Sequence, residues 1–68
     1  MKKKEFKSLR PGDRLVVIGN TPPDHYHEIG AVVDVINIKQ HLQEVLCEDI
    51  ASGLQQQVCR KNLSLINK

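Results

Sequence analysis

Branched aliphatic residues recur along this chain in short runs that turn residues separate. Val and Ile together occupy thirteen positions, and helical periodicity is weak throughout. Residues branched at Cβ favour extended strands, where they pack well on a pleated surface. The pattern therefore predicts a small antiparallel β-protein.

Five short strands are expected, each bounded by residues that favour turns. Pro11-Gly12 comes before the first strand and Gly19-Asn20 follows it, so Leu15 and Val17 share one face. The strands are expected over 13–18, 29–38, 41–48, 54–58 and 63–66, with a single 3₁₀ turn over 59–62 before the last.

Alternation within these runs predicts which side chains enter the core. In the third strand Val45 and Cys47 are expected to point inward, and in the fourth Leu54 and Val58. The second strand breaks strict alternation, which predicts a β-bulge or bend near 33–34. Leucine and isoleucine at 42, 46 and 50 leave a helical alternative for 38–50, but the flanking segments favour a strand.

The segment 21–28 is expected to be a loop, because Pro22-Pro23 cannot donate ladder hydrogen bonds. Five short strands with few aromatic residues make a thin core, and a sheet that closes on itself would hide both edges. We therefore expect one all-β domain over 9–68, a five-stranded barrel.

The positive charge is concentrated at the start of the chain. Five basic residues against Glu5 alone give +4 over residues 1–10, while five basic and seven acidic residues give −2 over the remainder. Residues 1–8 are therefore expected to form a basic, flexible tail. No signal segment or membrane span is evident, and two Cys are too few for a disulfide framework, so the expected location is cytoplasmic.

Three stretches carry a resemblance to a known fold family. The residues Pro11-Gly12-Asp13-Arg14-Leu15-Val16-Val17 resemble the opening of small SH3-like barrels. The run from Glu28 to Val35 resembles the second strand that those barrels share with KOW-type domains, and the run from Val58 to Ile66 resembles their 3₁₀ turn and closing strand. The chain is thus similar to short SH3-like proteins of phages and bacteria, which implies an SH3-like barrel but no single function.

The expected function is that of a small, non-enzymatic module that docks a protein partner. A phage or bacterial regulator or inhibitor that occludes its partner's surface would fit this size. With Phe6 and Tyr26 as its aromatic residues, the chain lacks the aromatic groove of SH3 domains that bind Pro-rich peptides. The expected contacts are His25, Tyr26, His27, Glu28, Lys39, His41 and Arg60.

Two alternatives remain open from the sequence. Nucleic-acid binding would use the basic residues at both ends of the chain and would weaken steeply with salt. Self-assembly through an exposed strand edge would give a mass above that of one chain. The residues that would contact phosphates are Lys2, Lys3, Lys4, Lys7, Arg10 and Lys61, with Lys39 and Arg60 beside them.

Metal and enzyme chemistry have weaker support in the sequence. His25 and His27 would point the same way in an extended segment, but the chain lacks the paired spacing of established zinc modules. Cys47 and Cys59 are expected to be reduced thiols in the core rather than nucleophiles. No metal, cofactor or catalytic residue is expected.

Overall fold

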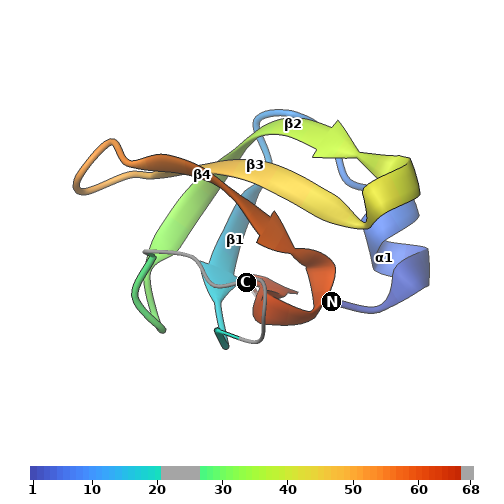
Figure 1. The fold of residues 1–68 in the computed structure, drawn as a ribbon, viewed down its shortest axis with the longest axis horizontal. Coiled ribbons are helices and arrows are strands. Elements are labelled where there is room, and N and C mark those ends of the chain that lie inside the picture. The colour runs from blue at the N-terminus through green and yellow to red at the C-terminus, as the bar shows by residue number, and fades with distance from the viewer. Residues whose placement is uncertain (21–26, 67–68) are drawn as a thin grey trace.

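Five antiparallel strands form one sheet in the computed structural model, which describes residues 1–20 and 27–66 (Figure 1). The strand order is β4-β3-β2-β1-β5. The elements are α1 (Lys3–Lys7), β1 (Arg14–Val17), β2 (Val32–Lys39), the 3₁₀ helix η1 (Gln40–Leu42), β3 (Glu44–Asp49), β4 (Gln55–Cys59), the 3₁₀ helix η2 (Arg60–Asn62) and β5 (Leu63–Leu65).

The mostly-β prediction is confirmed, and so is the short 3₁₀ turn before the last strand. The helical alternative over 38–50 is wrong, because that segment holds the end of β2, the three-residue η1 and strand β3. The sheet bends strongly, but β4 and β5 are its two edges, and among the described residues no pairing joins them. The structure thus shows a five-stranded antiparallel sheet and does not show its closure into a barrel.

One bulge in β2 lies later than the sequence pattern suggested. Val33 and Val35 both point inward, and Val35 pairs with Cys47. The next pair is Asn37 with Leu46, so Ile36 is the extra residue, and no bulge occurs at 33–34. Because alternation survives up to Val35, Val32 points to the outer face of the sheet.

The core lies on the concave side of the sheet and takes its members from every strand and from the N-terminal segment. Val45, Cys47 and Val58 are buried as expected. Leu54 is not: it is 38% exposed, because it ends the β3–β4 turn, which projects beyond the core (Figure 1). The core residues are Phe6, Leu9, Leu15, Val17, Val33, Val35, Val45, Cys47, Val58 and Leu63.

The N-terminal segment, expected to be a flexible tail over 1–8, forms helix α1 and contributes to the core. Phe6 has no exposed surface. The backbone N–H of Lys2 donates to Glu5 Oε1 at 3.0 Å, which satisfies one free donor at the start of the helix. Arg60 Nη1 donates to the Met1 carbonyl at 2.6 Å, so this segment also contacts η2. The packed part of the domain therefore begins before residue 9.

Candidate functional site

Large aliphatic side chains are exposed together on the convex side of the sheet, near the start of β2. Ile50 follows β3, and its N–H donates to the Val32 carbonyl at 3.2 Å, which places it beside β2. Ile66 directly follows β5, the strand that pairs with β1, and lines the same surface. Ile29 and Ile50 are 69% and 47% exposed. We call these residues, Ile29, Val32, Ile50 and Ile66, the outer apolar face.

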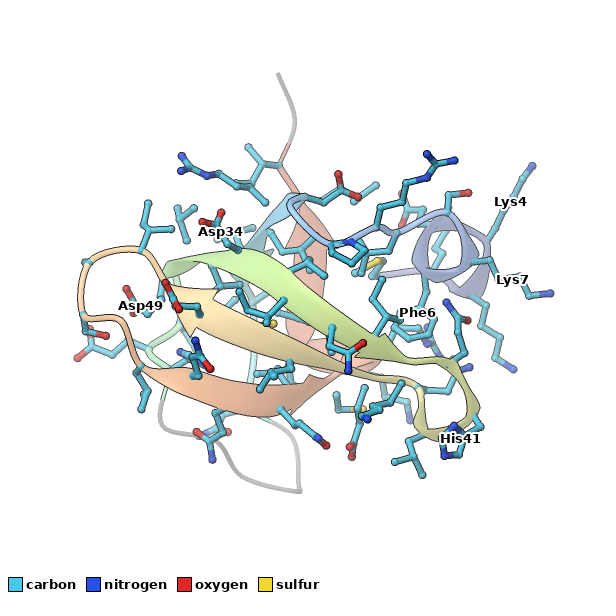
Figure 2. All side chains as sticks on the ribbon, turned by 90° about the horizontal axis from the view of Figure 1, so that it is seen from above. Lys4, Phe6, Lys7, Asp34, His41 and Asp49 are labelled. Atoms are coloured by element: carbon cyan, nitrogen blue, oxygen red, sulfur yellow. The ribbon has the colours of Figure 1, made fainter. Side chains whose placement is uncertain are left out.

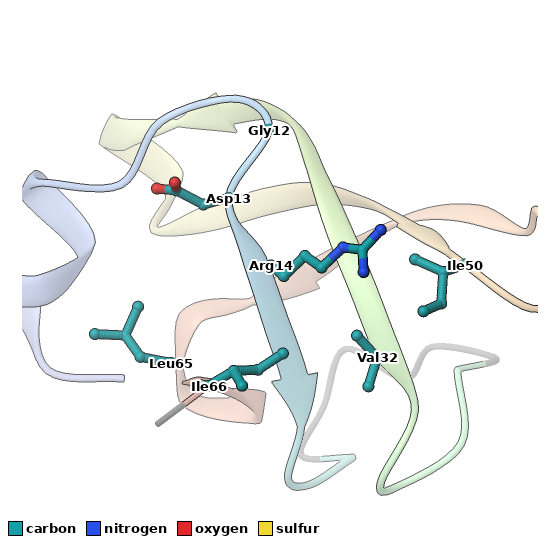
Figure 3. A pocket seen from close by; sticks show the side chains of 7 residues that line it. All are labelled: Gly12, Asp13, Arg14, Val32, Ile50, Leu65 and Ile66. Carbon is teal, nitrogen blue, oxygen red and sulfur yellow. The ribbon is translucent and has the colours of Figure 1, made fainter. Parts of the chain in front are cut away.

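Two open hollows adjoin on this face. The larger, of about 720 Å³, is lined by Arg14, Val32, Ile50 and the end of β5, together with Gly12 and Asp13 (Figure 3). The smaller, of about 490 Å³, extends from Val32 and Ile50 to residues 28–31 and 49–51. Because Val32 and Ile50 line both hollows, the two hollows are continuous with each other.

Charged side chains border the outer apolar face. Arg14 Nε donates to Asp34 Oδ1 at 2.9 Å across the β1–β2 pair, and both side chains are accessible to solvent. Glu28 and Asp49 line the smaller hollow. An exposed ion pair of this kind adds at most about 1 kcal/mol to stability.

This face combines exposed aliphatic side chains with a charged border. An apolar surface rimmed by polar groups on a small protein is typical of an interaction site. Over residues 1–20 and 27–66, no group of three or more His, Cys, Asp or Glu side chains is placed to hold a metal ion.

The residues expected at the partner contact are separated by the fold. His25 and Tyr26 lie outside the described residues. His27, expected to be an exposed contact, is buried, with 4% of its surface accessible. Glu28 is exposed and borders the outer apolar face.

The other three expected contacts lie at the opposite end of β2. Lys39 ends that strand and His41 lies in η1 directly after it. Arg60 donates from Nε to Gln43 Oε1 at 2.8 Å, which joins η2 to the turn after η1. Eight residues of strand span about 25 Å, so these three side chains cannot share a small contact with Glu28.

The cations expected at a nucleic-acid contact come from the N-terminal segment, the end of β2 and η2. Helix α1 presents exposed Lys3, Lys4 and Lys7, and the contact of Met1 with Arg60 places η2 beside its start. Lys4, Lys7 and His41 lie at the same end of the molecule in Figure 2. We call this group the basic end: Lys2, Lys3, Lys4, Lys7, Arg10, Lys39, Arg60 and Lys61.

The two cysteines differ in environment. Burial raises the pKa of the Cys47 thiol to about 12, so it stays protonated at neutral pH and is a poor nucleophile. Cys59, which was expected in the core, is partly exposed at the end of β4.

The buried thiol makes stability depend on pH in the alkaline range. The unfolded chain ionises Cys47 near its ordinary pKa of 9.0, whereas the folded chain keeps it protonated to about pH 12. The free energy of unfolding should therefore fall by about 1.4 kcal/mol per pH unit above pH 9. Denaturant titrations at pH 8 and about 10.5 should show wild type losing about 2 kcal/mol more than Cys47→Val. Equal losses would contradict this account of Cys47.

Neither Ile50 nor Ile66 was expected at a contact. Ile50 was interpreted as part of a turn or as the end of a possible helix over 38–50, and Ile66 was assigned only to the closing strand. A large aliphatic residue within a polar turn is the one signal that pointed to this surface, because a turn offers it no core to enter.

Comparisons of the chain with protein families, with characterised proteins and with solved structures found no match. Over the residues that the structure describes, no helix has the length and apolar character needed to cross a membrane.

Proposed function

We propose that this chain is a small, SH3-like, non-enzymatic module that binds a protein partner through the outer apolar face. It would act as a regulator or inhibitor by covering its partner's surface. The proposal differs from the sequence-based one in the position of the contact: of the expected contacts that the structure describes, Glu28 alone borders the face.

The observation that carries the proposal is the concentration of exposed aliphatic residues around the two adjoining hollows. Ile29 and Ile50 leave a large apolar area in water. Each buried Å² of such surface contributes about 25 cal/mol, so a partner that covers this face gains several kcal/mol. The Arg14–Asp34 pair and Glu28 supply the polar border that fixes the orientation of a docked protein.

Photo-crosslinking in the cells that make the protein tests this proposal. A benzophenone amino acid replaces Ile50, within the face, or Gln40, which is exposed on η1. We expect one discrete adduct with another protein from position 50 and none from position 40. The second substitution Ile66→Asp should reduce that adduct by about tenfold, because it places a charge in the apolar contact.

The matched control for that substitution is Lys61→Asp, an equally exposed change in the basic end. It should leave the adduct from position 50 unchanged. Identical adducts from positions 50 and 40, or an adduct that Ile66→Asp does not weaken, would overturn the proposal.

The basic end favours nucleic-acid binding as a second candidate function. Here the observation is the contact of Arg60 Nη1 with the Met1 carbonyl, which gathers cations from both ends of the sequence. Gathered cations attract a phosphate backbone, and each phosphate contact steepens the salt dependence by about 0.9 in the log–log slope on duplex DNA.

Titration with duplex and single-stranded DNA and RNA at low and moderate salt tests this candidate. We expect the Lys4→Ala and Lys7→Ala double variant to lower both the affinity and the salt slope, whereas Ile50→Ala changes neither. Absence of binding at low salt would remove nucleic acid as a ligand class.

A further inference from the structure

The backbone of β4 presents alternate residues to an open edge. The Asp49 N–H donates to the Leu54 carbonyl at 2.9 Å, and the Arg60 N–H donates to the Gln43 carbonyl at 2.8 Å. In an antiparallel pair, every second residue directs its N–H and C=O toward the partner strand. Residues 54 and 60 both direct their backbone groups toward β3. The backbone groups of Gln55, Gln57 and Cys59 therefore point away from β3.

No other strand in the described part of the chain uses this edge. β4 pairs with β3 alone, and the sheet ends there. Figure 1 shows β4 along the border of the sheet, between the projecting β3–β4 turn and η2. Three residues at this border therefore offer backbone donors and acceptors to a further strand.

The side chains of β4 do not protect this edge strand against pairing with a further strand. Soluble proteins commonly place Lys, Pro or a bulge on an edge strand to prevent association. β4 reads Gln-Gln-Gln-Val-Cys, with no charged residue, no proline and a regular register. The other edge, β5, is also uncharged but has three residues, which gives a much shorter template.

We propose that a second copy of this chain adds to this edge through its own β4, antiparallel, with a two-fold axis at Gln57. Gln57 then faces Gln57 of the second copy, and Gln55 faces Cys59 of the second copy. These are the residues whose backbone groups point outward, so each pair forms two ladder hydrogen bonds. All facing side chains are neutral, so no like charges are opposed.

Charge complementarity favours a second copy over an unrelated extended peptide. In the antiparallel arrangement, Arg60 of one copy lies opposite Leu54 of the other, and Lys61 lies opposite Gly53. Both Leu54 and Gly53 are hydrogen-bonded to Asp49, and Glu48 accepts from Gln55 Nε2 at 2.6 Å, so this end of the hairpin is acidic. The basic η2 of each copy thus approaches the acidic turn of the other.

Substitutions at residue 57 test the interface selectively, because the two-fold axis places this residue opposite the same residue of the second copy. Gln57→Glu and Gln57→Lys each oppose like charges, whereas a mixture of the two variants opposes unlike charges. Gln57 is exposed, and its backbone amide points away from β3, so either substitution places its charge in solvent in the isolated chain. Gln40→Glu, on exposed η1, is the matched control for the added charge.

Sedimentation velocity measures the mass between about 10 µM and about 1 mM chain, the range expected for a small interface. Wild type and Gln40→Glu should shift toward twice the chain mass of 7.7 kDa as concentration rises. Each Gln57 variant alone should raise the dissociation constant by about tenfold or more, and the equimolar mixture should restore dimers.

A wild-type mass of one chain at every concentration would overturn the proposal. So would dimers that persist equally in both Gln57 variants, since the interface would then lie elsewhere. The outer apolar face is untouched by these changes, so the crosslink from position 50 reports on the proposed function separately.

Discussion

Replacement of Phe6 by alanine is expected to lower the free energy of unfolding by about 3–5 kcal/mol, the usual cost of truncating a buried aromatic side chain. Phe6 has no exposed surface and packs with Leu9 and the core of the sheet. It is the one Phe of the chain, and the core around it consists of much smaller aliphatic side chains. A domain of this size has few kcal/mol to lose, so the variant should be largely unfolded.

Lys4→Ala is the matched control, because Lys4 lies in the same helix and is exposed. Its free energy of unfolding should stay within about 0.5 kcal/mol of wild type. Urea denaturation followed by circular dichroism measures both. A loss below about 1 kcal/mol for Phe6→Ala would mean that the N-terminal segment is the flexible tail that its charge pattern suggested.

Leu63→Ala should cost about 2–5 kcal/mol, because Leu63 is fully buried where β5 pairs with β1. Its backbone follows η2 directly, and Val17 is its partner across the two strands. Truncation leaves a cavity between this pair that the short β5 strand cannot close without losing its register.

Leu54→Ala removes the same side chain from a position that alternation had placed in the core. The structure leaves Leu54 38% exposed at the end of the β3–β4 turn, so we expect a loss below about 1 kcal/mol. Thermal and urea unfolding of the two leucine variants compare the sites directly. Similar losses at both positions would show that the turn packs on the core after all.

The strands could be predicted from the sequence because branched aliphatic runs and turn residues are local signals. Leu15 with Val17 and Val45 with Cys47 follow strict alternation and are buried as expected. The bulge was predicted too early in β2. Val32 and Val35 are both apolar, and both can point inward only if the strand is irregular between them. A pattern of residue types cannot tell a half-buried outer valine from a core valine when the outer face is itself apolar.

The N-terminal helix could not be predicted because its sequence is dominated by lysine. Phe6 and Leu9 are three positions apart, the spacing of one helical face, but two residues give too short a period to identify. The backbone contact that holds the segment joins Arg60 to Met1, 59 positions apart. Long-range contacts of this kind leave no trace in a local pattern.

The outer apolar face was not predicted for a related reason. Its residues are 29, 32, 50 and 66, and no local period links them. The partner contact was predicted in the loop 21–28 because two His and the Tyr lie there in one run. Burial of His27 removes one of those contacts from the surface.

Amide chemical-shift mapping of the ¹⁵N-labelled chain with its crosslinked partner tests whether the outer apolar face is the contact. We expect the largest changes at Ile29, Val32, Ile50 and Ile66, and little change at Lys4, Lys7 and Lys61. Changes concentrated in the basic end, with the outer apolar face unaffected, would contradict this expectation.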